Sequence, residues 1–105
     1  MLEFLVAASL ELAHDAEWYE ARAVGLGERF LADVRQALDL IEERPEAGSP
    51  WLLPGIPAGV RHVPLRTFRH SVVYVLSPRP IVIAVAHGSQ EPTYWIDRLD
   101  EVESS

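Results

Sequence analysis

The apolar residues of this chain recur at helical spacing in the first half and at strand spacing in the second. Segments 8–22 and 28–44 each predict an amphipathic helix, because apolar residues return every three or four positions. Gly25 and Gly27 separate the two helices, and Pro45 ends the second. The apolar stripes consist of Leu12, Ala16, Tyr19 and Ala23 in the first helix and of Phe30, Leu31, Val34, Ala37, Leu38 and Ile41 in the second. Joined by so short a turn, the helices form an antiparallel hairpin whose two stripes face one core.

The second half of the chain predicts three strands. Residues 60–66 alternate between apolar and polar side chains, whereas 71–76 and 81–86 are continuous runs rich in β-branched residues. Continuous runs are typical of strands at the centre of a sheet that is covered on both faces. A short apolar run, Leu2–Val6, predicts an edge strand. Prolines and glycines make residues 47–59 a predicted loop, anchored to the core by Trp51, Leu52 and Leu53.

One α+β domain accounts for all 105 residues. The predicted order is β-α-α-β-β-β, with the helical hairpin packed on one face of a small antiparallel sheet. Residues 1–46 contain the edge strand and the hairpin, 60–88 contain the sheet, and 92–105 form a tail with a frayed acidic end.

The composition excludes several classes of site. The chain has no cysteine, which excludes disulfides, thiol catalysis and cysteine-based zinc sites. No apolar run approaches the roughly 20 residues of a membrane span, and the N-terminal segment lacks the basic start of a signal peptide. We therefore expect a cytoplasmic protein without a membrane partner. The four histidines are scattered, without the paired spacing of metal ligands, so we expect neither a metal nor another cofactor.

Charge is distributed unevenly along the chain. Residues 47–90 contain neither aspartate nor glutamate, and their formal charge is +4. Their basic residues are Arg61, Arg66, Arg69 and Arg79. Residues 1–46 carry −7 and residues 91–105 carry −4, which leaves the whole chain at −7. We expect a cationic surface on the sheet and its loops, suited to phosphates or to an acidic peptide. Equally, these arginines would do no more than offset the acidic helices.

Four further side chains are candidates for chemistry or binding. His87 follows the last strand, where it would act as a general acid or base near neutral pH, or would hydrogen-bond a loop. Tyr94 and Trp95 would stack on nucleic-acid bases, or would close the core against the helices. Arg98 would face a ligand or pair with an acidic helix residue.

A series of residues along nearly the whole chain points to one known family. In the hairpin the series comprises Tyr19, Leu26, Gly27, Arg29, Phe30 and Pro45. In the second half it comprises Arg61, Phe68, the SVVY of residues 71–74, the IVIAVAHG of residues 81–88, Pro92, Tyr94, Trp95 and Arg98. In this order the residues resemble the RelE/ParE toxin superfamily.

The resemblance implies the toxin of a bacterial type II toxin–antitoxin pair. Such a toxin inhibits growth until a cognate antitoxin wraps it with a C-terminal segment, forming a hetero-oligomer. One branch of the superfamily cleaves messenger RNA in the ribosomal A site, using basic residues on the sheet. Another branch poisons DNA gyrase and lacks that basic set.

The chain departs from both branches at specific positions. The basic positions of the RNA-cleaving branch fall on neutral or weakly basic residues, namely His62, Pro64, Ser71 and Gly88 or Ser89. The arginine run that many relatives carry after HG reads Ser89, Gln90, Glu91. The Phe-Pro-Tyr of many gyrase-type members reads Phe68, Arg69, His70.

We therefore predict a ParE-like toxin that acts on DNA gyrase. Two alternatives stay open: a RelE-type endoribonuclease that acts with the ribosome on messenger RNA, and a non-toxic relative that only binds an antitoxin. Whether the chain is an enzyme depends on that choice. A RelE-like enzyme would use Arg61, Arg66, His87 and Tyr94. The residues predicted to bind a partner are Arg61, Arg66, Arg69, Trp95 and Arg98.

Overall fold

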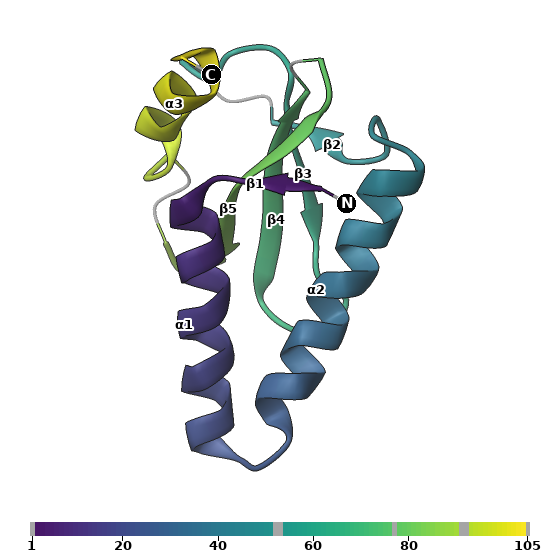
Figure 1. The fold of residues 1–105 in the computed structure, drawn as a ribbon, viewed down its shortest axis with the longest axis vertical. Helices are drawn as coiled ribbons and strands as arrows, with labels where there is room; N and C mark the ends of the chain where they lie inside the picture. The colour runs from purple at the N-terminus through teal and green to yellow at the C-terminus, as the bar shows by residue number, and fades with distance from the viewer. Residues whose placement is uncertain (1, 52–53, 77, 91–92, 105) are drawn as a thin grey trace.

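A five-stranded sheet with two long helices against one face forms the body of the computed structural model, which describes residues 2–51, 54–76, 78–90 and 93–104 (Figure 1). The elements in chain order are β1 (Glu3–Phe4), α1 (Val6–Arg22), α2 (Leu26–Glu43), β2 (Ser49–Pro50), β3 (Val60–Pro64), β4 (His70–Leu76), β5 (Pro80–His87), the 3₁₀ turn η1 (Ile96–Arg98) and α3 (Leu99–Ser104). The predicted α+β class and the helical hairpin are confirmed. Leu52 and Leu53, predicted to anchor the loop, lie outside the described residues.

The turn between α1 and α2 depends on two glycines and one acid. Gly25 has a φ of +87°, a left-handed conformation that residues with a side chain rarely adopt. The Glu20 carboxylate accepts hydrogen bonds from the backbone N–H of Gly25 at 2.9 Å and of Gly27 at 3.0 Å. A Cβ on Gly27 would lie 2.6 Å from the Ala16 carbonyl oxygen, so the helices approach closely here. The predicted break is therefore confirmed at Gly25, whereas Gly27, predicted to separate the helices, lies in the first turn of α2.

The sheet is mixed, which corrects the prediction that it is wholly antiparallel. Its strand order is β1-β5-β4-β3-β2. The β3–β4 and β4–β5 pairs are antiparallel, but β1 runs parallel to β5 through Glu3 and Phe4. Both helices lie in the connection between β1 and β5, and a crossover of this length permits parallel pairing. As predicted, β1 is an edge strand, whereas β2 is a short strand inside the predicted loop 47–59.

The core between the helices and the sheet is built from the predicted stripes. Phe30, Val34 and Ile41 of α2 are almost completely buried and pack toward Val72 and Tyr74 of β4. Tyr19 of α1, Phe30 and Phe68 form an aromatic cluster, with ring centroids 4.8–5.3 Å apart. Aromatic side chains bury large apolar areas, so this cluster fixes the hairpin on the sheet.

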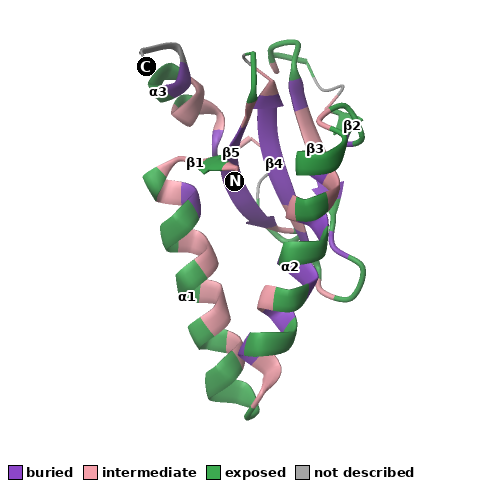
Figure 2. Ribbon diagram, turned by 45° about the vertical axis from the view of Figure 1, so that its right-hand side comes forward, coloured by how far each residue is buried: buried purple, intermediate pink, exposed green. Residues whose placement is uncertain are grey.

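The opposite face of the sheet is covered by the C-terminal segment and by Trp51. Trp95 is completely buried, and its ring lies 5.5 Å from that of Trp51. Val102 of α3 is also buried against this face, so the acidic end that was predicted to fray is packed at least as far as this residue. Accordingly, β4 and β5 are buried along most of their length (Figure 2). The strands of the cationic segment, residues 47–90, therefore do not form an open sheet face.

A bulge in β5 helps to build the core on this opposite face of the sheet, which we call the second core. The register against β4 shifts between Val73 and Tyr74, where Val73 faces Ala84 and Tyr74 faces Val82. Consequently Ile83 and Ala84, although adjacent in the chain, both contribute to the second core. In the described ranges, no helix is both long enough and apolar enough to cross a membrane.

Candidate functional site

The carboxylate of Glu11, on α1, is the centre of a half-buried polar cluster. It accepts hydrogen bonds from the Tyr94 hydroxyl at 2.6 Å and from both terminal nitrogens of Arg98 at 2.9 and 3.0 Å. It also accepts a 3.0 Å hydrogen bond from the backbone N–H of Val85. Arg98 in turn donates to the carbonyl of Ile83 at 2.9 Å. The cluster thus joins α1, β5 and the C-terminal segment.

These bonds lie along an edge of β5 that lacks a strand partner. Among the residues that the structure describes, β1 pairs with β5 at Ile81 and Val82 alone. Beyond that point Glu11 and Arg98 bind backbone groups of β5 that a neighbouring strand would otherwise bind. Arg98 therefore pairs with a helix acid, which was one of its two predicted roles.

The electrostatics of this cluster suit a structural role. Burial, together with the hydrogen bond to Glu11, raises the pKa of the Tyr94 hydroxyl well above its usual value. The bond to Glu11 likewise raises the pKa of Arg98. Tyr94 therefore stays protonated and donates to Glu11, and a hydroxyl held in this way is a poor general base. Glu11 itself was missed from the sequence, because it is one of eleven acids in residues 1–46 and no motif marks it.

Arg61 anchors the start of the loop 47–59 rather than facing an open site. Its Nη1 donates to the carbonyls of Glu46 at 3.0 Å and Gly48 at 2.7 Å. The Tyr74 hydroxyl reinforces the same loop by donating to Pro45 at 2.6 Å and accepting from the Gly48 N–H at 2.9 Å. Arg61 thus satisfies backbone carbonyls that the loop geometry leaves without strand partners.

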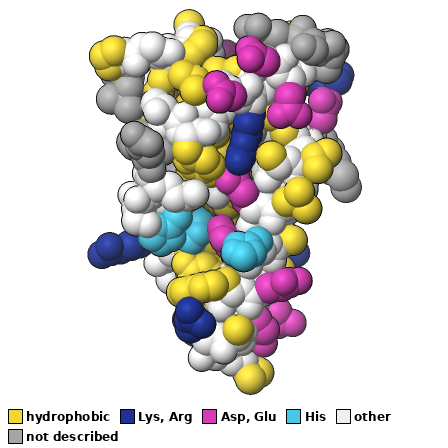
Figure 3. All heavy atoms as spheres, turned by 90° about the vertical axis from the view of Figure 1, so that its left-hand side faces the viewer, with side chains coloured by type: hydrophobic (Ala, Val, Ile, Leu, Met, Phe, Trp, Pro, Cys, Tyr) yellow, Lys and Arg dark blue, Asp and Glu magenta, His cyan; other side chains and the backbone are white. Residues whose placement is uncertain are grey.

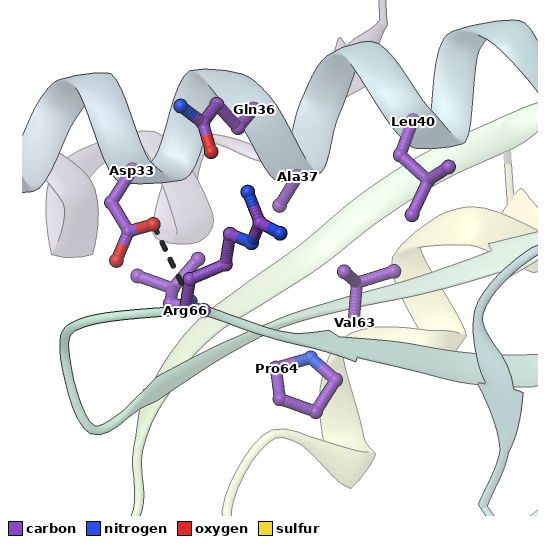
Figure 4. Close-up of a pocket in the computed structure, with 8 residues that line it drawn as sticks. Asp33, Gln36, Ala37, Leu40, Val63, Pro64 and Arg66 are labelled. Atoms are coloured by element: carbon purple, nitrogen blue, oxygen red, sulfur yellow. Dashed lines mark hydrogen bonds between the residues drawn. The ribbon is translucent and has the colours of Figure 1, made fainter.

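Arg66 lies on the turn between β3 and β4, which is held by a buried acid of α2. The Asp33 carboxylate accepts hydrogen bonds from the backbone N–H groups of Arg66 at 3.3 Å, Thr67 at 2.9 Å and Phe68 at 3.2 Å. The Arg66 side chain extends along α2, over a hollow that Gln36 also lines (Figure 4). Arg66 and Arg69 are both exposed on this turn. Among the predicted partner-binding arginines these two are exposed, whereas Arg61 and Arg98 are partly buried.

Two histidines meet where β4 begins and β5 ends. The rings of His70 and His87 are 4.8 Å apart, and His70 Nε2 lies 3.2 Å from the Asp15 carboxylate. Burial lowers the pKa of the His70 imidazole, although the Asp15 carboxylate favours the charged form. His87 Nδ1 accepts a 3.0 Å hydrogen bond from the Ser89 N–H and lies 2.6 Å from its hydroxyl oxygen. His87 thus bonds its own loop, one of the two roles predicted for it.

A shallow hollow beside these histidines gathers most of the positions that are basic in the RNA-cleaving branch. Pro64, Ser71, Gly88 and Ser89 line it together. None of these four side chains is cationic, and the guanidinium group in the lining belongs to Arg69. His62 contributes elsewhere, since its ring lies 4.5 Å from that of Trp51 and burial lowers its pKa. The fold therefore brings the expected positions together but supplies little positive charge.

The four residues predicted for catalysis are not brought into one site. Arg61 is bound to the loop at Gly48, Arg66 lies over the α2 hollow, His87 bonds Ser89, and Tyr94 bonds Glu11. Trp95, predicted to bind a partner, is completely buried in the second core and unavailable for that role in this structure. Among the residues that the structure describes, no three histidine, aspartate or glutamate side chains gather to hold a metal ion.

Comparison with known proteins supports the fold. No protein-family model and no curated protein matches the chain. A solved chain of the chromosomal ParDE toxin–antitoxin system from P. aeruginosa superposes with a TM-score of 0.63, over 82% of this chain and 92% of that chain, at 17% sequence identity. The chain has a ParE-like fold. The RelE/ParE-like architecture predicted from the sequence is confirmed, and the ParE-like fold includes the N-terminal strand, the helical hairpin and the mixed sheet.

Proposed function

We propose that this chain is the toxin of a type II toxin–antitoxin pair and forms a hetero-oligomer with a cognate antitoxin. The supporting observation is the shared fold with a chain of the ParDE system, which covers 82% of this chain and 92% of that chain. Arg66 and Arg69, exposed on the turn between β3 and β4, are the predicted cations best placed to meet an acidic part of a partner. This function would place the protein in the bacterial cytoplasm.

We further infer that the toxin acts in the ParE-like manner on DNA gyrase rather than by cutting RNA. Phosphodiester cleavage needs cations that stabilise the charged transition state and groups that move protons. At the positions where the RNA-cleaving branch is basic, the hollow instead has Pro64, Ser71, and Gly88 or Ser89. The arginine in its lining is Arg69, and its two histidines, His70 and His87, are engaged with Asp15 and Ser89. Tyr94, one of the four residues predicted for a RelE-like enzyme, is bonded to Glu11 elsewhere.

Three measurements separate these activities, two in cells after induced expression and one with purified gyrase. A gyrase poison leaves messages intact, fragments chromosomal DNA and inhibits supercoiling by purified gyrase. An A-site endoribonuclease instead produces cuts in messenger RNA that primer extension maps to the reading frame. Cuts in messages, with gyrase unaffected, would overturn the gyrase proposal in favour of RelE-type cleavage.

The small positive charge of this hollow also favours one second candidate, a relative that binds an antitoxin without being toxic. The exposed loop after β5 reads Gly88, Ser89, Gln90, and it lacks the arginines that many relatives carry there. Absence of any growth effect, together with a stable complex with the product of the adjacent reading frame, would support this candidate. Growth arrest in the absence of that product would exclude it.

A further inference from the structure

Helix α1 carries apolar side chains on the face that the core does not use. Its inner face supplies Leu12, Ala16 and Tyr19 to the first core. On the outer face Val6 is 73% exposed, Leu10 is 65% exposed and Trp18 is 47% exposed. Large apolar side chains that stay accessible along one element of a folded chain mark an interaction surface more often than a solvated one.

These side chains form a single row along the helix. Val6, Leu10, His14 and Trp18 follow one another at intervals of four residues, which is the spacing of the ridges by which helices pack. Arg22 continues the row, and its guanidinium lies 4.0 Å above the Trp18 ring. We call Val6, Leu10, His14 and Trp18 the α1 ridge. Seen from the α1 side, hydrophobic side chains reach the surface between acidic and histidine side chains (Figure 3).

A groove runs beside the α1 ridge. It lies between α1 and β5 and is lined by Ala7, Leu10, Glu11, His14, Asp15, Val85 and Gln90. Helices pack when the ridge of side chains on each helix enters the groove of the other. The α1 ridge could enter a groove on a second helix, and a ridge on that helix could enter the groove beside α1. The surface is therefore shaped for a helix.

The charges around the ridge select the kind of helix. α1 carries Glu11, Asp15, Glu17 and Glu20 against Arg22 alone. Glu11, Asp15 and Glu20 have partners inside the molecule, whereas Glu17 is exposed on the outer face next to the ridge. A second copy of this chain would place residues 1–46 of two chains, each of formal charge −7, against each other. The same negative charge would repel nucleic acid or an anionic membrane.

We propose that the α1 ridge and its groove bind an amphipathic, basic helix of the antitoxin. This proposal rests on the toxin–antitoxin function proposed above. The apolar face of that helix covers Leu10 and Trp18, and its Lys or Arg residues meet Glu17. Exposed aromatic and aliphatic anchors surrounded by charge complementarity account for most of the affinity in interfaces of this kind.

The test uses the full chain and the protein encoded by the adjacent reading frame, mixed after separate purification. The double variant Leu10→Glu/Trp18→Ala removes the ridge, and Val24→Glu is the matched control, because Val24 is 98% exposed but lies in the turn outside the ridge. We expect the double variant to weaken binding by about a hundredfold and Val24→Glu by less than about threefold. Circular dichroism melting checks that each variant folds.

A charge reversal tests the nature of the partner. Glu17→Arg is expected to weaken binding by about tenfold at low salt and less at high salt, whereas Asp39→Arg, on the exposed side of α2, is expected to leave it unchanged. Tight binding by a well-folded double variant would overturn the ridge proposal and leave the toxin–antitoxin function intact. No binding by the wild-type chain would overturn both. A dimer of the free chain that the double variant dissociates would assign the ridge to a second copy instead.

Discussion

Glu11 and Arg98, 87 residues apart in the chain, form a bidentate ion pair with distances of 2.9 and 3.0 Å. The pair binds the C-terminal segment to α1 and covers the part of the β5 edge that β1 leaves unpaired. α3 and Trp95 cover the second face of the sheet, so the ion pair also holds this C-terminal segment against the second core.

We expect Arg98→Ala to lower the free energy of unfolding by roughly 2–4 kcal/mol, because it leaves a half-buried carboxylate without two of its donors. Urea unfolding measures the difference. The control is Arg79→Ala, which breaks an ion pair with Glu3 whose side chains are 73% and 46% exposed. That variant should change stability by less than about 1 kcal/mol. Equal effects of the two variants would contradict the structural role of Glu11 and Arg98.

His70 should make the fold sensitive to acid. Burial lowers its pKa in the folded protein, so the unfolded chain binds the proton more readily. Stability is therefore full above the usual histidine pKa of about 6.5 and falls as the pH drops through the lower folded value. Three titratable groups act on the pKa of the His70 imidazole through their charges. Asp15 and Glu11 favour the protonated imidazole, whereas His87 disfavours it.

The variant His70→Phe should reduce the loss of stability between pH 7 and pH 5, as followed by thermal melting at each pH. The phenyl ring would keep the packing against Tyr19 and Phe30, whose rings lie 5.8 and 4.9 Å from that of His70. Part of the acid loss should persist in His70→Phe, because burial also lowers the pKa of His62. An unchanged profile in His70→Phe would refute this assignment.

Asp33 should fix the turn that presents Arg66 and Arg69. Its carboxylate accepts three backbone hydrogen bonds from that turn, so Asp33→Ala should cost roughly 2–4 kcal/mol of stability. Amide hydrogen exchange should accelerate at Thr67 and Phe68 in this variant. Asp39→Ala, an exposed change on the same helix, should affect neither property. Unchanged exchange at Thr67 and Phe68 would show that the turn is held by other contacts.

The sequence predicted best where apolar spacing alone determines structure. The stripe of α2 from Phe30 to Ile41 and the continuous runs of β4 and β5 specify which faces are buried, and the structure follows them. The direction of β1 could not be predicted in this way, because two residues carry no information about parallel or antiparallel pairing. The strand β2 could not be predicted, because Ser49 and Pro50 lack the apolar alternation of a strand.

The C-terminal helix and the polar contacts were much less predictable. α3 has few apolar residues, and the burial of Val102 depends on the contact of this segment with the sheet rather than on its own periodicity. Glu11 and Asp33 resemble any other acid on an amphipathic helix until the fold places backbone N–H groups beside them. For the same reason Arg61, which reads as part of a cationic surface, is bound within the molecule. For Arg98 the sequence left two roles open, and the fold selects the pair with Glu11.

Growth after induced expression tests the central claim most directly. The wild-type chain is expressed from a tightly regulated promoter, alone and together with the product of the adjacent reading frame. The proposed function predicts growth arrest in the first culture and normal growth in the second. Normal growth in the first culture, with the folded protein confirmed in the cells, would contradict the assignment of this chain as a toxin.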